Sequence, residues 1–177
     1  MKDEFDRVLI RSLIEVDIDN AEKFLKFINE IINDPSAKVS FNKQRVINEE
    51  KMWLKEVIGL INQKKMVQMV VFLDNEVVGM SDVTLQRERK SHVGEFGIAL
   101  TEKARGRKLG SKLAKAAIEE SMNLFGDRLR VIKVSFPVSK NQVKDFYKSL
   151  GFIEVAIIPD QYLFDELEAE TVIIKRI

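Results

Sequence analysis

The sequence predicts a mixed α/β domain with a mostly antiparallel central sheet of six to seven strands, flanked by about four helices. Three observations predict this class. Short aliphatic runs alternate along the chain with segments of helical periodicity. Two of these runs flank Asp74-Asn75, a dipeptide typical of a hairpin turn. A helix-length segment joins the runs 92–100 and 129–138, and such a crossover connects parallel neighbours.

The composition is that of one globular domain, residues 1–177, with a core of its own. Its 29 basic and 28 acidic residues leave a net charge of +1, which favours neither nucleic acid nor a membrane as a partner. The absence of cysteine excludes disulfides, thiolate metal sites and cysteine nucleophiles. Residues 1–10 are too acidic for a signal peptide, and no apolar run reaches the roughly 20 residues of a membrane span. We expect a soluble, cytoplasmic protein without a metal.

The N-terminal half is predicted to hold a strand, two helices and a hairpin. Apolar residues at three- and four-residue intervals indicate the first helix, which Asp34-Pro35-Ser36 ends. The predicted elements are a strand at 7–14, helices at 21–32 and 42–62, hairpin strands at 66–73 and 76–85, and a polar loop at 86–91.

The C-terminal half alternates strands and helices before it ends in two strands. Gly126 and Gly151 follow helical patterns, where glycine commonly ends a helix. The predicted elements are a strand at 92–100, a helix at 106–125, a strand at 129–138, a short helix at 140–150, and strands at 152–158 and 171–177.

The most informative segment is Gly94 to Ser111, GEFGIALTEKARGRKLGS, a strand that runs into a basic turn and then opens a helix. A helix N-terminus presents N–H groups and a partial positive charge to an anion. Arg105, Arg107 and Lys108 add three cations, and Gly110 allows a ligand to approach closely because it has no Cβ. The spacing is not that of a Walker A loop, so the turn predicts a phosphate site of another kind.

This turn and a second motif resemble the GNAT N-acetyltransferase superfamily, whose members move an acetyl group from acetyl-CoA to an amine. The superfamily motif Q/R-x-x-G-x-G/A corresponds to Arg105 through Gly110, with Lys108 where glycine is usual. The second motif matches in order and spacing, as Asn141, Phe146-Tyr147 and Leu150-Gly151-Phe152. The resemblance covers residues 76–158 well, and is looser in the N-terminal helices and the tail.

The resemblance implies acetyl-CoA as the acyl donor. The turn would hold the pyrophosphate, and the strand end at Ile98 would pair with the pantetheine amides in a gap between strands 92–100 and 129–138. Asn141 would fix the start of the short helix and hold cofactor amides. The implied cofactor-binding residues are Ile98, Ala99, Leu100, Arg105, Gly106, Arg107, Lys108, Leu109, Gly110, Ser111, Asn141, Phe146 and Tyr147.

Two residues are predicted to be catalytic. Tyr147 is the candidate acid, because a phenol with a pKa of about 10 stays protonated at neutral pH and can protonate the leaving thiolate. Glu95, three residues before Ile98 on the same strand, is the candidate base. His92, the only histidine, is an alternative, and without a bulge it points to the opposite face of the strand. An amine with a lowered pKa would need no dedicated base.

The sequence does not identify the amine acceptor, and the candidates are a protein N-terminus, a lysine, a polyamine, an amino acid or an amino-containing drug. Trp53 and the tail residues Tyr162, Phe164, Asp165 and Glu166 are candidates to line its site, and equally candidates for packing and solvated charge. Two other classes stay open, namely a catalytically silent GNAT-like domain that binds CoA and an α/β phosphate-binding domain without a role for CoA. Exchange of the tail strand between subunits would make a homodimer.

Overall fold

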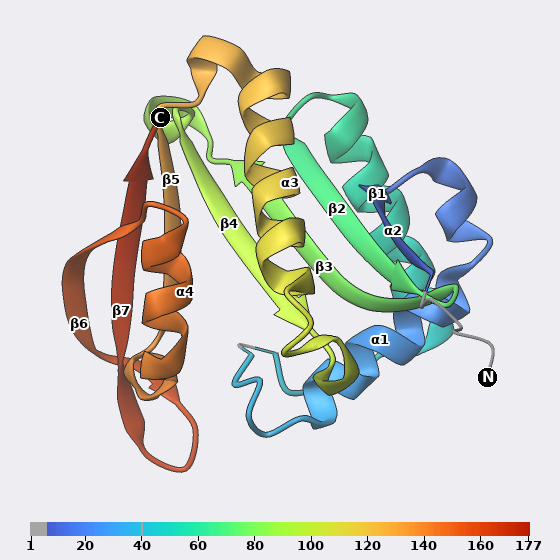
Figure 1. Cartoon of the computed structure of the whole chain (residues 1–177), viewed down its shortest axis with the longest axis horizontal. Helices are drawn as coiled ribbons and strands as arrows, with labels where there is room; N and C mark the ends of the chain where they lie inside the picture. Colours follow the sequence, from blue (N-terminus) through green and yellow to red (C-terminus); the bar gives the residue numbers. More distant parts are fainter. Residues whose placement is uncertain (1–6, 40) are drawn as a thin grey trace, which may run out of the picture.

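Seven strands form one sheet with helices on both faces in the described part of the chain, residues 7–39 and 41–177 of a computed structural model (Figure 1). The sheet order is β1-β2-β3-β4-β5-β7-β6, which confirms the predicted class. The strands are β1 (Val8–Ser12), β2 (Met66–Leu73), β3 (Glu76–Leu85), β4 (Val93–Leu100), β5 (Val131–Pro137), β6 (Ile153–Leu163) and β7 (Leu167–Arg176). The α-helices are α1 (Ala21–Asn33), α2 (Ile47–Asn62), α3 (Leu109–Phe125) and α4 (Lys144–Ser149).

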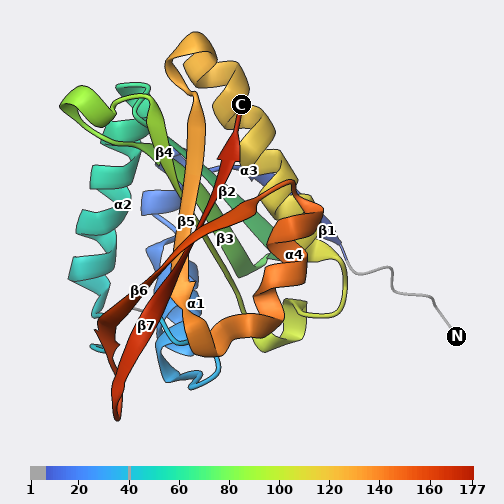
Figure 2. The same ribbon diagram turned by 90° about the vertical axis from the view of Figure 1, so that its left-hand side faces the viewer.

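The sheet separates two hydrophobic cores. Helices α1 and α2 cover one face, and α3 and α4 cover the other (Figure 2). Every residue of β2 is buried, because its side chains alternate between the two cores: Val67 and Val71 pack on the α3 side, and Val70 and Phe72 on the α2 side. Burial on both faces explains why this strand reads as a nearly unbroken apolar run.

Three helices begin later than predicted. The starts are Ile47 for α2 instead of residue 42, Leu109 for α3 instead of residue 106, and Lys144 for α4 instead of residue 140. A short 3-10 segment, Val138–Val143, precedes α4. Side-chain periodicity shows which residues share a face, whereas the start of a helix depends on backbone geometry that the pattern does not contain.

The C-terminal hairpin is longer than predicted, since β6 and β7 together span most of residues 153–176. Pro159 lies where the register shifts between Ile158 and Tyr162, so the strand continues past a proline that the sequence pattern takes as its end. β7 lies between β5 and β6 and pairs with both. Exchange of this strand between subunits would therefore break two ladders, and the homodimer stays a prediction.

The sheet opens between β4 and β5. The two strands pair in parallel only over Val93–Glu95 and Val131–Lys133. Beyond that point β4 pairs with β3 alone as far as Leu100, and β5 pairs with β7 alone as far as Pro137. The predicted parallel pair and the predicted gap between these strands are confirmed.

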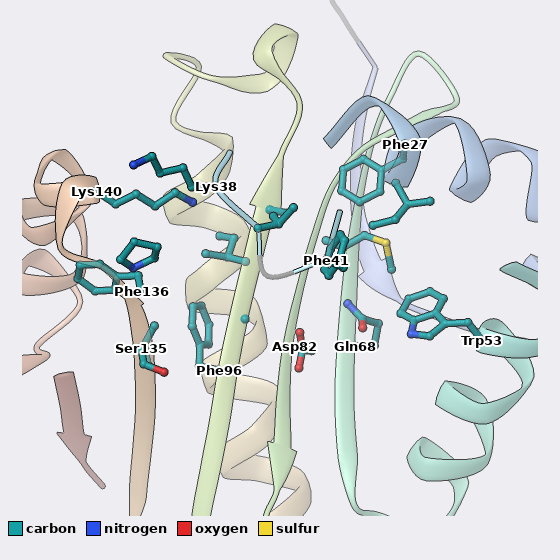
Figure 3. A pocket seen from close by; sticks show the side chains of 18 of the residues that line it. Phe27, Lys38, Phe41, Trp53, Gln68, Asp82, Phe96, Ser135, Phe136 and Lys140 are labelled. Carbon is teal, nitrogen blue, oxygen red and sulfur yellow. The ribbon is translucent and has the colours of Figure 1, made fainter. Parts of the chain in front are cut away.

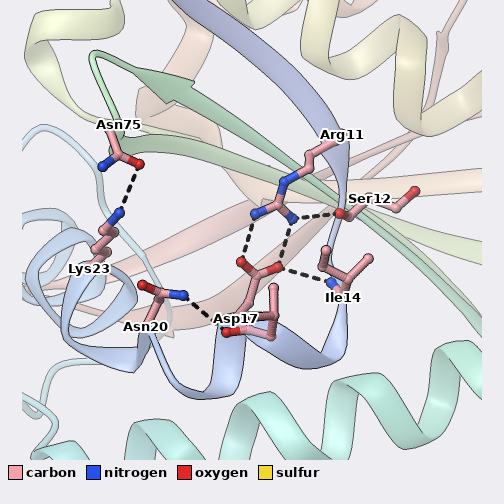
Figure 4. A network of polar contacts seen from close by, with 8 residues as sticks. Arg11, Ser12, Ile14, Asp17, Asn20, Lys23 and Asn75 are labelled. Carbon is pink, nitrogen blue, oxygen red and sulfur yellow. Dashed lines mark hydrogen bonds and ion pairs between the residues drawn. The ribbon is translucent and has the colours of Figure 1, made fainter.

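A buried ion pair ties the first strand to the segment before α1 (Figure 4). Asp17 is 2% exposed and accepts two hydrogen bonds of 2.7 Å from the Arg11 guanidinium. It also accepts the N–H of Ile14 at 2.9 Å, and Lys23 of α1 donates a hydrogen bond to Asn75 at 2.8 Å. These contacts fix α1 against the sheet.

No helix within the described ranges is long and apolar enough to cross a membrane. Residues 1–6, part of the acidic stretch that argues against a signal peptide, lie outside the described residues. The cytoplasmic location stays a prediction.

Candidate active site

A cleft of about 350 Å³ lies where the sheet opens, with walls from both faces of the sheet (Figure 3). Its first part, the splay half, is lined by the separated strand ends and neighbouring residues: Phe96, Ile98, Ala99, Val134, Ser135, Phe136, Lys140 and Tyr147. Its second part, the helix half, is lined by Phe27, Phe41, Arg45, Glu50, Trp53, Gln68 and Asp82. The cleft thus connects the α3–α4 face of the sheet with the α1–α2 face.

Tyr147 lies in the splay half within an aromatic cluster. Its ring stacks on Phe136 of β5 with centroids 5.5 Å apart. It meets Phe96, Phe146 and Phe152 edge-on at 5.1 to 6.2 Å. Burial raises the pKa of Tyr147 well above its ordinary value, so the phenol is protonated at neutral pH.

The turn before α3 keeps a glycine-like backbone although Lys108 replaces the usual glycine. Lys108 has a φ of 60° and Gly106 a φ of 73°, both in the left-handed region that favours glycine. The Lys108 carbonyl still accepts the N–H of Lys112 at 3.2 Å, as the first helical hydrogen bond requires. The side chain of Leu109 is buried in the core, which leaves only its backbone for a ligand.

Gly110 lies where α3 comes close to β4 and α4. A Cβ at this position would lie 3.3 Å from the Leu100 side chain and 3.9 Å from Phe146. These neighbours are side chains of the protein itself, so close approach of a ligand to Gly110 stays a prediction.

Arg105, in the turn before α3, is partly neutralised by a carboxylate. Arg105 pairs with Asp34 and donates a hydrogen bond to the Ser36 hydroxyl at 3.0 Å. That hydroxyl and the Arg105 guanidinium together lower the pKa of Asp34. A phosphate bound to Arg105 would have to displace Asp34 or share the guanidinium with it. Burial lowers the pKa of Lys140, and the nearby positive charge of Arg105 lowers it further by a smaller amount.

The side chain of Asn141 does not fix the start of the short helix, contrary to what the resemblance implied. α4 begins three residues after it, and no side chain caps the helix start. The backbone carbonyl of Asn141 accepts the N–H of Lys144, while its side chain is exposed. The motif asparagine therefore precedes the helix in a 3-10 segment instead of opening it.

Neither predicted base lines the cleft. Glu95 is 56% exposed, accepts a hydrogen bond from Gln86 at 2.7 Å and lies 3.5 Å from the Lys133 ammonium. His92 is exposed at the closed end of the opening, where its carbonyl accepts the N–H groups of Arg130 and Val131. The base role of Glu95 stays a prediction.

Asp82 of β3 is the carboxylate that sequence reasoning missed. It lies opposite Gly97 of β4, where a Cβ would be only 2.6 Å from its Oδ1 atom. Burial raises the pKa of Asp82 to about 6, and the charge of Glu95 adds to the shift. The sequence contained a signal for this residue, because aspartate is rare in strands and Asp82 lies in the middle of an otherwise mostly apolar strand.

A second carboxylate, Glu50 of α2, lies in the helix half beside Arg45. The Arg45 guanidinium donates a hydrogen bond to Glu50 Oε2 at 3.0 Å and lies over the Trp53 ring at 5.3 Å. Burial raises the pKa of Glu50 and outweighs the opposing effect of Arg45. Gln68 is buried on β2 and faces the same space.

The tail contributes one of its predicted residues to the cleft. Tyr162 lines it and donates a hydrogen bond to Glu170 at 3.2 Å. Phe164 stacks on Tyr162 with centroids 5.8 Å apart, whereas the turn residues Asp165 and Glu166 are exposed and do not line the cleft. Trp53, for which the sequence left both a place in the acceptor site and core packing open, lines the cleft.

The chain belongs to the GNAT acetyltransferase family, whose family model matches residues 28–152. That range contains the turn before α3, both strands that separate, Asp82 and Tyr147. A search among curated proteins finds no match.

Solved structures share the fold over nearly the whole chain. A GNAT-family acetyltransferase from Streptococcus pneumoniae is 19% identical, with a TM-score of 0.79, and covers 97% of this chain and 99% of its own. A ribosomal-protein-alanine N-acetyltransferase from Brucella melitensis is 20% identical, with a TM-score of 0.78 and coverages of 96% and 99%. A putative acetyltransferase from Salmonella typhimurium, solved with its cofactor acetyl-CoA, is 15% identical, with a TM-score of 0.76 and coverages of 96% and 95%.

The left-handed backbone at Lys108 predicts an unusual effect of glycine there. Lys108→Gly should raise the free energy of unfolding by about 0.5–1 kcal/mol, because glycine adopts this conformation without a Cβ clash. Lys115→Gly, at an exposed interior position of α3, should lower it by about 0.5–1 kcal/mol. Urea unfolding of both variants measures these free energies. An equal loss of unfolding free energy in the two variants would contradict a left-handed backbone at Lys108.

Proposed function

We propose that this protein is an N-acetyltransferase that moves the acetyl group of acetyl-CoA to a primary amine. The cleft is the observation that supports this most, because it passes through the sheet with Tyr147 in one half and Asp82 in the other. Family membership supports acetyl transfer. Structural relatives that are named for N-acetylation, or that were solved with acetyl-CoA, support the amine acceptor and the donor.

In this proposal acetyl-CoA occupies the splay half. Strand edges beyond Glu95 and Lys133 have no partner strand across the opening, so their amide groups are available to the pantetheine arm at Ile98–Leu100. The backbone of residues 105–111 holds the pyrophosphate at the start of α3. Lys140 adds positive charge at the mouth.

The proposed reaction needs one acid and one base. The amine nitrogen attacks the thioester carbon, a C–N bond forms, and the C–S bond breaks. Asp82 accepts the proton that the amine loses, directly or through one water, and Tyr147 donates a proton to the departing sulfur. A pKa of about 6 lets Asp82 act as a carboxylate base at neutral pH. Because burial raises the pKa of Tyr147, its phenol carries the proton that it gives to the sulfur.

Calorimetric titration with acetyl-CoA tests the donor site. We expect micromolar binding, at least about a hundredfold tighter than that of inorganic pyrophosphate, because the pantetheine arm adds contacts that pyrophosphate lacks. Absence of acetyl-CoA binding would reject the proposal. Binding without transfer to any amine would favour a silent CoA-binding domain.

The acid role predicts the behaviour of Tyr147→Phe. This variant should lose about 10²-fold or more in kcat, because the leaving sulfur has no proton donor, while its affinity for acetyl-CoA changes by less than about threefold. Steady-state kinetics and calorimetry measure the two quantities. Full turnover of the phenylalanine variant would reject Tyr147 as the acid.

The base role predicts a pH profile that separates Asp82 from Glu95. In the wild type, kcat should rise with pH through about 6 and then level off, because only the carboxylate form of Asp82 accepts a proton. Asp82→Asn should lose this rise and about 10²-fold in kcat. Glu95→Gln should shift the rise to lower pH and keep the plateau, because one nearby negative charge is removed. The reverse pattern would assign the base to Glu95.

A further inference from the structure

The helix half of the cleft has charges of opposite sign in two places. Asp82 lies against Gly97 on the sheet, next to the strand end at Ile98. Arg45 lies in the segment before α2 and lines the same cleft. An acceptor that fills this half therefore meets a carboxylate near the thioester and a guanidinium elsewhere in the same half.

At the Arg45–Glu50 pair the accessible charge is positive. The side chain of Glu50 is 1% exposed, whereas that of Arg45 is 24% exposed. Glu50 engages one guanidinium nitrogen, Nη1, at 3.0 Å. Because a guanidinium carries five N–H donors in a planar fork, Glu50 holds Arg45 in place and leaves further donors for a ligand.

Aromatic rings hold the guanidinium on its other sides. Its Cζ atom lies 5.3 Å from the centroid of Trp53 and 5.7 Å from that of Phe41. These rings and Phe27 also line the cleft, so its walls beside Arg45 are apolar. A positioned guanidinium with apolar walls recognises a planar anion attached to an apolar group.

We infer that the acceptor is a small amine that also carries a carboxylate, namely an amino acid with an apolar side chain. Its amine would lie at Asp82, its carboxylate at Arg45, and its side chain against the aromatic wall. This inference rests on the proposed acetyl transfer and names its substrate class. A polyamine would place a second cation near Arg45, and a peptide N-terminus lacks a carboxylate on the residue that carries its amine.

The test compares leucine with leucinamide, which differ only in the carboxylate, with spermidine and an alanine-initiated peptide as further acceptors. The wild type should acetylate leucine with a kcat/KM at least about tenfold above that of each other amine, mainly through KM. Leucinamide has the lower amine pKa and so more free amine at neutral pH, which makes the comparison stringent.

Variants assign the preference to Arg45. The double change Arg45→Met and Glu50→Met removes both charges together, so that no buried carboxylate is left unpaired. It should bring the kcat/KM values of leucine and leucinamide within about threefold of each other, and an unchanged affinity for acetyl-CoA, which is proposed to bind in the splay half, would show that the fold is intact. Arg45→Lys should keep part of the preference, because its charge remains without the fork. Lys43→Met, which removes a more exposed cation of the same segment, should keep all of it.

The outcomes separate the inference from the proposed function. Equal or better turnover of leucinamide, spermidine or the peptide by the wild type would overturn the inference and leave acetyl transfer established. A leucine preference that survives in the double variant would overturn the role of Arg45. Failure to bind acetyl-CoA, together with failure to acetylate any of the four amines, would overturn both.

Discussion

The short parallel contact between β4 and β5 is the constraint on which the rest of this structure depends. Because the strands pair only over Val93–Glu95 and Val131–Lys133, each continues with a single partner strand. The edges that face each other then carry polar backbone groups without a strand to pair with them, at the cleft where the two strands separate. The cleft lies where the strands separate, and in the proposed function the amides of the pantetheine arm pair with these edges.

Burial raises the pKa of both Asp82 and Tyr147, and the two shifts suit the two different roles proposed for these residues. It raises the pKa of Asp82 to about 6, which leaves a carboxylate at neutral pH with an affinity for protons. It raises the pKa of Tyr147 as well, which keeps the phenol protonated. Both residues line the same cleft, from opposite faces of the sheet. In the proposed reaction, a carbonyl in the opening would have Asp82 as the base on one side and Tyr147 as the acid on the other.

Much of the fold could be predicted, because periodicity, turn residues and the crossover are local signals. The hairpin at Asp74-Asn75 and the parallel pairing of β4 with β5 followed from them, whereas the gap beside β4 was implied by the resemblance. The site was predicted unevenly. Tyr147 belongs to a motif of adjacent residues, whereas Asp82 on β3 and the Arg45–Glu50 pair at the start of α2 are far apart in the sequence. Glu95 is the carboxylate nearest Ile98 in the sequence, yet the carboxylate that lines the cleft is Asp82, on the neighbouring strand β3.

By itself the sequence determined the order of strands and helices, the basic turn before α3, and the resemblance to acetyltransferases, since each depends on residues close together in the chain. Only the tertiary structure decided that Asp82, and not Glu95, lines the cleft. It also decided that Glu50 is covered while Arg45 stays accessible, and that Lys108 adopts a left-handed backbone conformation typical of glycine. These depend on packing between β3, β4, α2 and α3, elements that the chain brings together only when it folds. Burial, which sets both the pKa values and the accessible charge, is a property of that packing.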